Sequence, residues 1–213
     1  MRRPRSWLLL CALHGVASML LWWTQPTTLE WMTWRSDEDL HYPWTLWTSA
    51  WVYQSTPQLI GHQLALGVLT AFAWVVRPPW TSTLAWFLTW PLAQASLLLW
   101  PQIGYAIGLS GVLHAGWAVL AVQLLQRRIE MPQAQRWGGL LMAGLLLKLG
   151  LERAWDHPVV WDSGNDRSLV QAAHLAGAVW GLCLGGLARW LPTVRRRARA
   201  PSPPAPPDET VHP

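Results

Sequence analysis

Two motifs with the residue types of acyl transfer lie inside otherwise apolar sequence. The first runs from Gly104 to His114 (GYAIGLSGVLH) and holds Ser110 between Gly108 and Gly111. Glycine permits a tight, irregular chain, after which Ser110 opens an apolar helix. Unpaired N–H groups and the positive dipole at a helix N-terminus stabilise an oxyanion formed beside it. Ser110 is therefore a candidate nucleophile; the structural alternative is a helix N-cap with glycines that serve close packing.

The second motif is a histidine followed by evenly spaced glycines in the last apolar segment. Gly177, Gly181 and Gly185 recur every four residues and form one stripe that another helix can approach closely. His174 precedes Gly177 by three residues and lies near the same stripe. An ionisable residue in a membrane segment is costly unless it faces protein or water. We therefore predict that His174 is the general base for Ser110.

Six apolar segments are expected to position these motifs as helices. They are about Trp7–Trp23, Leu59–Val76, Trp80–Trp100, Ser110–Gln126, Trp137–Leu151 and Leu169–Leu191. A helix needs roughly 20 residues to cross about 30 Å of hydrocarbon, so the second, fourth and fifth segments are short. We explain the shortness by a helix that begins below the membrane surface, reached by irregular chain that protein shelters.

The first segment has an alternative interpretation as a cleaved signal peptide. Arginines at positions 2, 3 and 5 precede its apolar run, as in secretory signals. However, His14 interrupts the run and no small-x-small cleavage site follows it. A retained first helix is therefore expected.

Basic residues gather on one side of the expected helices. The net charge is +5, and 12 of the 16 Lys and Arg residues lie at the two ends or in alternate loops. Because cytoplasmic loops are rich in Lys and Arg, six spans with both termini in the cytoplasm satisfy every loop. The cluster Arg195–Arg199 is expected to meet anionic lipid headgroups, so the charge does not indicate a nucleic-acid partner. We expect a basic cytoplasmic N-terminus (1–6), a six-helix membrane domain (7–191) and a disordered, basic and Pro-rich cytoplasmic tail (192–213).

Tryptophan is the most unusual feature of the composition. Nineteen of the 213 residues are Trp, 52% are hydrophobic and 13% are charged, which excludes disorder and coiled coil. Trp prefers the bilayer interface, so we expect a belt at the span ends. Its members are Trp7, Trp22, Trp23, Trp80, Trp100, Trp137 and Trp190. Five more tryptophans (31, 34, 44, 47 and 51) fall in the first outer loop, about 24–58, which is expected to lie in the outer leaflet beside the active-site mouth. Cys11 and Cys183 lack metal or redox spacing and are expected to be buried packing residues.

The two motifs resemble those of the rhomboid intramembrane serine proteases, over roughly residues 5 to 192. That family has G-x-S-G at the start of one buried helix, here Gly108 to Gly111, and H-x-x-G-x-x-x-G on the last core helix, here His174 to Gly181. Within the family the chain is most similar to the rhombosortases, in which G-L-S-G-V-L-H is typical, here Gly108 to His114. The resemblance implies an all-α membrane fold, a six-helix bundle whose fourth helix starts inside the membrane. It also implies a Ser110–His174 dyad in the bacterial inner membrane that faces the periplasm.

Two histidines differ from the rhomboid pattern. If Trp44–Thr48 is aligned with the family's start of this loop, His62 falls where an oxyanion-hole Asn is expected. Two interpretations of His62 stay open, an oxyanion donor and a polar packing residue. His114 follows Ser110 by four residues, where rhomboids commonly carry a Tyr that stacks on the catalytic His. We expect His114 to orient or pack His174, with simple structural packing as the alternative.

The leading hypothesis is an intramembrane serine endopeptidase that needs no cofactor or metal. The rhombosortase resemblance implies substrates anchored by a C-terminal apolar helix that follows a Gly-Gly-containing tail and precedes basic residues. The alternative is a catalytically inactive rhomboid-like protein that binds transmembrane helices as a chaperone or adaptor. A haem or metal protein using His62, His114 and His174 lacks the usual ligand spacing and accompanying carboxylate. Lys148 pairs with Glu152 at i+4 and is expected to be structural.

Overall fold

The computed structural model describes residues 5–24, 26–38, 41–163 and 167–192. Within these ranges the fold is mainly helical, as predicted, with eight α-helices. They are α1 (Arg5–Trp22), α2 (Pro26–Met32), α3 (Thr45–Thr48), α4 (Thr56–Val76), α5 (Trp80–Ala95), α6 (Ser110–Leu125), α7 (Ala134–Glu152) and α8 (Gln171–Leu187). Residues 1–4 of the expected N-terminal region and 193–213 of the expected tail lie outside the described residues.

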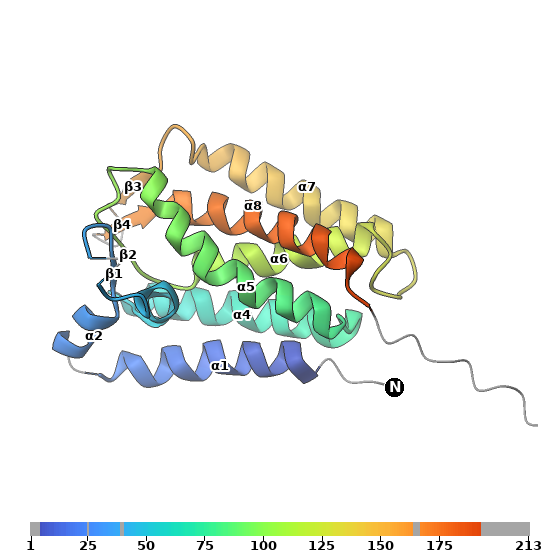
Figure 1. The fold of residues 1–213 in the computed structure, drawn as a ribbon, viewed down its shortest axis with the longest axis horizontal. Coiled ribbons are helices and arrows are strands. Elements are labelled where there is room, and N and C mark those ends of the chain that lie inside the picture. Colours follow the sequence, from blue (N-terminus) through green and yellow to red (C-terminus); the bar gives the residue numbers. More distant parts are fainter. Residues whose placement is uncertain (1–4, 25, 39–40, 164–166, 193–213) are drawn as a thin grey trace, which may run out of the picture.

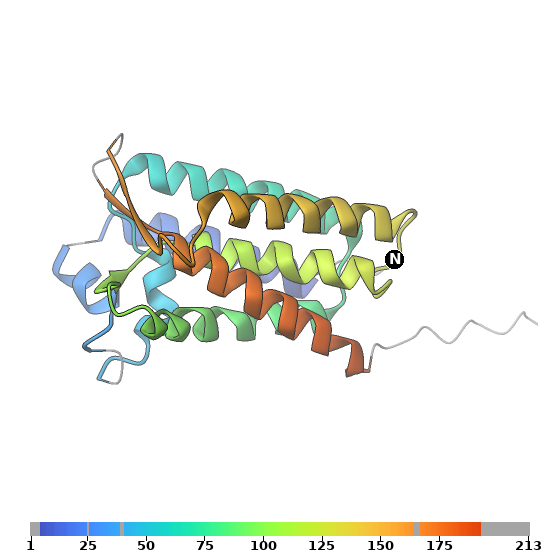
Figure 2. The same ribbon diagram turned by 90° about the horizontal axis from the view of Figure 1, so that it is seen from above.

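The six longer helices run along the long axis of one bundle (Figure 1). The beginning of α1 and the end of α8 lie at the same end of the bundle, and the short helix α2 lies at the other. Seen from above, α6 lies in the middle of the bundle (Figure 2). Eleven of its residues are buried, on all of its faces. The helix that begins with the candidate nucleophile is therefore surrounded by protein.

Three of these helices are long and apolar enough to cross a membrane, namely Arg5–Trp22, Thr56–Val76 and α8 extended to Trp190. α6 is apolar but shorter, at 16 residues. A proline at position 91 lies inside α5, which ends at Ala95 and continues as a 3₁₀ helix, η2 (Ser96–Leu99). The apolar segments predicted from the sequence thus correspond to helices, with ends that differ by a few residues.

Two small sheets and short helices were not predicted. β1 (Trp34–Arg35) pairs antiparallel with β2 (Tyr105–Ala106), and β3 (Val159–Asp162) pairs with β4 (Arg167–Val170). The chain between α1 and α4 also holds α2, α3 and a 3₁₀ turn, η1 (Ser49–Trp51). The strands gather at the end of the bundle opposite to the start of α1 (Figure 1). Because β2 ends four residues before Ser110, its pairing with β1 joins the loop between α1 and α4 to the chain that leads into α6.

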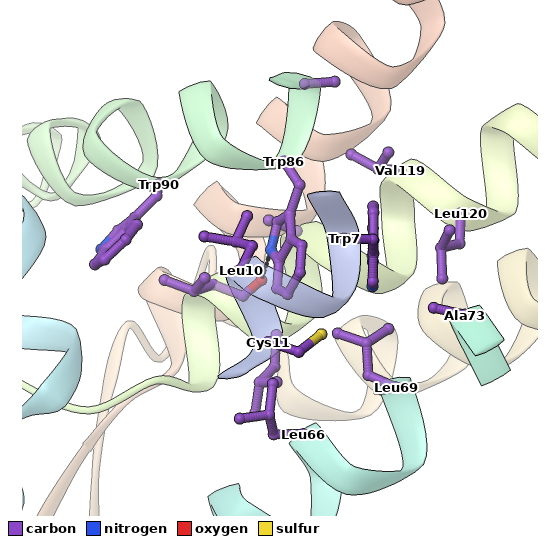
Figure 3. Close-up of a cluster of buried hydrophobic side chains, with 14 of the residues drawn as sticks. Trp7, Leu10, Cys11, Leu66, Leu69, Ala73, Trp86, Trp90, Val119 and Leu120 are labelled. Carbon is purple, nitrogen blue, oxygen red and sulfur yellow. Dashed lines mark hydrogen bonds between the residues drawn. The ribbon is translucent and has the colours of Figure 1, made fainter. Parts of the chain in front are cut away.

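Tryptophan forms much of the core as well as its edge. Trp7 is fully buried and stacks on Trp86 of α5, with ring centroids 4.4 Å apart (Figure 3). The Trp86 Nε1–H donates to the Val112 carbonyl oxygen at 2.8 Å, which fixes α5 against α6. The prediction that Trp7 belongs to the interfacial belt is therefore wrong. Trp7 lies near the start of α1, but its ring turns toward α5 instead of outward.

Of the other tryptophans predicted to face the membrane interface, some are exposed and some are buried. Trp23, Trp80, Trp137 and Trp190 are exposed, as a belt requires. Trp34, which was expected in the outer leaflet, is fully buried in a cluster with Leu97, Ile103, Ala106 and Ala172. Its pairing with Ala106 carries it into the protein.

The two cysteines differ in exposure. Cys11 is buried, as expected, whereas Cys183 is exposed. Cys183 lies two residues after Gly181, so it falls on another side of α8 from the glycine stripe.

The glycine stripe of α8 faces α6. A Cβ atom on Gly181 would lie 2.6 Å from the Ala115 carbonyl oxygen, and one on Gly185 would lie 2.7 Å from Val122 Cγ1. A Cβ atom on Gly177 would overlap the carbonyl oxygen of Gly111. Only glycine therefore permits this approach of the two backbones.

Candidate active site

One cavity brings the sequence-predicted site residues together. It has a volume of about 520 Å³ and is bordered by α4, α5, α6, α7, α8 and the strand β4. The predicted residues that line it are Gly108, Ser110, Gly111, His62, His114 and His174. Gly177, Gly181 and Gly185 are absent from its lining and lie at the α6–α8 contact.

Ser110 is the first residue of α6, and Leu109 occupies the N-cap position. The structural alternative of Ser110 as the N-cap is therefore wrong. Among the described residues, the Ser110 hydroxyl makes no hydrogen bond, including none to His174. Catalytic hydrogen bonds are often long or poorly aligned without substrate, so this arrangement does not argue against a nucleophile–base pair.

The chain before Ser110 is held by its backbone. Gly108 has φ = 94°, which L side chains rarely adopt, and its N–H donates to the Ser49 carbonyl oxygen at 2.9 Å. A Cβ atom there would lie 2.8 Å from Gln58 Nε2 and 3.1 Å from His62 Cε1. Gly108 thus lets the chain pass close to α4 before it turns into α6.

His62 lies beside this turn. Its Nδ1 accepts a hydrogen bond from the Leu109 N–H at 3.3 Å, and its ring makes an edge contact with Tyr53, with centroids 5.5 Å apart. Because Nδ1 accepts, the neutral ring carries its proton on Nε2. Burial raises the pKa of Tyr53, which lies between η1 and α4, to about 12, so this neighbour of His62 stays neutral.

His114 stacks on His174. The two rings are nearly parallel, with an interplanar angle of 13° and centroids 4.3 Å apart. His114 Nδ1 donates to the carbonyl oxygen of Ser110 at 2.7 Å, which fixes the plane of its ring. His114 thus joins the residue proposed as nucleophile to the residue proposed as base, through packing on one side and a hydrogen bond on the other.

Glu152 is the site residue that sequence reasoning missed. Its two carboxylate oxygens lie 2.9 and 3.0 Å from His174 Nδ1, and its Oε1 lies 2.5 Å from Lys148 Nζ. Glu152 follows the apolar segment 137–151 directly. The Lys148 ammonium at Oε1 and the hydrogen bond from His174 both favour the charged form of the carboxyl group. These contacts stabilise the ionised carboxylate.

A metal ion is a second use for such a cluster. Ligand atoms of His114, Glu152 and His174 all lie within 4.8 Å of one another, and imidazole and carboxylate are zinc ligands. The carboxylate that the sequence-based metal hypothesis lacked is thus present. However, the Lys148 ammonium already neutralises Glu152, and His114 Nδ1 is bound to the Ser110 carbonyl. These contacts favour proton chemistry over a cation.

His14 has a partner that the sequence did not indicate. It is fully buried in α1, and its Nδ1 accepts a hydrogen bond from Trp51 Nε1 at 3.1 Å. Its ring also contacts Trp90, with centroids 4.5 Å apart. His14 is not among the residues that line the cavity and packs instead against Trp51, Trp86 and Trp90.

Compared with known proteins, the chain matches no protein-family model and no curated protein.

Proposed function

We propose that this protein is an intramembrane serine endopeptidase of the rhomboid type, with Ser110 as nucleophile and His174 as general base. One observation carries the proposal. Ser110 at the N-terminus of α6 and His174 near the N-terminus of α8 line one cavity, on two helices that glycines hold in close contact. Contacts from Glu152 and His114 fix the His174 ring in the manner that a general base requires.

The reaction would follow from these groups. His174 Nε2 takes the proton of the Ser110 hydroxyl as Oγ attacks a peptide carbonyl, and the protonated imidazole then gives that proton to the departing amine. N–H groups at the start of α6 stabilise the oxyanion. Because His62 Nδ1 accepts a hydrogen bond, the neutral ring carries its proton on Nε2, and this N–H can donate to an oxyanion. That tautomer supports the assignment of His62 as an additional donor. Water then hydrolyses the acyl-enzyme.

The membrane setting extends the proposal. Six helices correspond to the six apolar segments, and the start of α1 and the end of α8 lie at one end of the bundle, as an even number of spans requires. With the arginine-rich end in the cytoplasm, the site faces the periplasm of a bacterial inner membrane. The motif Gly108 to His114 supports substrates of the rhombosortase kind, with Gly-Gly before a C-terminal apolar anchor.

The test is cleavage of such an anchored reporter by the full chain in liposomes. Ser110→Ala and His174→Ala each abolish cleavage and leave the helical content unchanged. Ser163→Ala and His41→Ala, which make the same chemical changes at exposed positions, cut at the wild-type rate. Cleavage by either Ser110→Ala or His174→Ala would reject the proposal.

A second candidate function is a binder of transmembrane helices that does not cut them. The presence of His62 where the rhomboid pattern has Asn favours it. A fluorophosphonate probe separates the two functions. Modification of Ser110 in the folded protein supports the protease, and an unmodified Ser110 together with reporter binding supports the binder.

A further inference from the structure

The His174 imidazole is held on its Nδ1 side by a carboxylate from another helix. Glu152 is the last residue of α7, and His174 lies in the first turn of α8. Both side chains are largely buried, with 15% and 12% of their surface exposed. An ionised carboxylate only accepts hydrogen bonds, so the proton of the neutral imidazole must lie on Nδ1. That leaves the lone pair of Nε2 for the cavity.

We propose that Glu152 is a positioning residue that fixes the tautomer and the plane of the His174 ring. This inference rests on the proposed function and extends the proposed Ser110–His174 dyad to a triad of Ser110, His174 and Glu152. In serine proteases with a Ser-His-carboxylate triad, the carboxylate stabilises the imidazolium and does not itself take the proton. The proton of Ser110 therefore travels to His174 Nε2 and on to the leaving amine, while Nδ1–H stays bonded to Glu152.

Two contacts keep Glu152 in this role. Lys148, one helical turn earlier, binds Oε1 and balances its charge. The side-chain amide nitrogen of Gln171, when oriented toward the neighbouring carbonyls, donates to the backbone oxygen of Glu152 at 2.6 Å. That bond joins the end of α7 to the start of α8, so the two partners are positioned by backbone as well as by side chains.

The opposite side of the His174 ring is also fixed. The His114 ring stacks on it, and His114 is tied to the Ser110 carbonyl. The titratable groups that face His174 are therefore His114 from α6 and Lys148 and Glu152 from α7, and His62 and Tyr105 line the same cavity. Among these groups, the Glu152 carboxylate accepts a hydrogen bond from His174 Nδ1.

Glu152→Gln tests the proposal, because an amide can present either a donor or an acceptor to Nδ1 and no longer selects one tautomer. We expect kcat for the anchored reporter to fall about 10²- to 10⁴-fold with little change in KM, as for other triads that lose their carboxylate. Glu152→Asp keeps the charge on a shorter side chain and recovers part of the rate. The matched control is Glu30→Gln, the same change on the exposed face of α2, which cuts like the wild type.

A readout independent of cleavage is the ¹⁵N NMR spectrum of histidine-labelled protein in micelles. The His174 signals, assigned by their loss in His174→Ala, show a proton on Nδ1 in the wild type and a mixture of tautomers in Glu152→Gln. An unchanged His174 spectrum in Glu152→Gln overturns the inference, whether or not cleavage falls. Full cleavage by Glu152→Gln also overturns it. If instead the wild type and Ser110→Ala are equally inactive, the proposed function has failed, and the catalytic role of Glu152 fails with it.

Discussion

Gly181→Ala is expected to separate α6 from α8. The added Cβ would lie 2.6 Å from the Ala115 carbonyl oxygen and 2.7 Å from Ala118 Cβ, whereas ordinary contacts begin at 3.4 Å. The helices must therefore move apart by about 0.8 Å, the difference between 3.4 and 2.6 Å, and overpacking of this kind costs about 1–3 kcal/mol. The carbonyl oxygen is backbone, so it cannot rotate away.

Gly186→Ala provides the matched control on the same helix. Its Cβ meets nothing nearer than Gln126 Nε2 at 3.7 Å. Both variants gain the same helix propensity, about 1 kcal/mol for Gly to Ala, so the difference between them isolates the contact. Unfolding in mixed detergent micelles, followed by circular dichroism, measures that difference.

The separation of α6 from α8 in Gly181→Ala is also expected to change the distance between Ser110 and His174. Gly181 lies on the helix that carries His174, and Ala115 lies on the helix that carries Ser110. A misplacement of about 1 Å can cost about 10²-fold in rate, so Gly181→Ala is expected to cut the reporter far more slowly than Gly186→Ala. Equal stability of the two variants would refute the close-packing reasoning, because it would mean that α6 and α8 tolerate a Cβ between them.

Two further predictions concern the residues that support the site. Trp86→Phe loses the buried hydrogen bond to Val112 and part of the stack with Trp7, so the free energy of unfolding is expected to fall by about 1–3 kcal/mol in the same detergent titration. Gly108→Ala places a Cβ at φ = 94° and against Gln58, and is expected to lower stability by about 1–2 kcal/mol. Gly104→Ala, where a Cβ meets nothing within 4 Å, is the control for thermal unfolding, and equal midpoints would contradict the strain at Gly108.

Helix positions were predictable because apolar runs and their breakers are local features. The segment predicted at Ser110–Gln126 is α6, Ser110–Leu125, since the glycine-rich chain before it marks its start. The segment Trp80–Trp100 ends earlier as an α-helix, at Ala95, and continues in 3₁₀ form. The strands were not predictable, because two-residue pairings such as Trp34 with Ala106 depend on contacts between distant parts of the chain.

The Glu152 contact shows the same limit within the site. The sequence places Glu152 one turn from Lys148, and that local pair is present. Its bond to His174, 22 residues away, depends on how β3 and β4 return the chain from α7 to α8. Likewise, the direction in which Trp7 turns its ring follows from the position of α5, which no local pattern specifies.

The pairing of β1 with β2 connects the loop between α1 and α4 to the chain that precedes Ser110, so the two segments are expected to move together. Trp34 is paired with Ala106, the Ser49 carbonyl holds the Gly108 N–H, and Ser110 follows two residues later. A displacement of this loop is therefore expected to reach the start of α6 through these backbone hydrogen bonds. An antibody fragment or cyclic peptide that binds the exposed rings of Trp31 and Trp44 is therefore expected to shift Ser110 without entering the cavity.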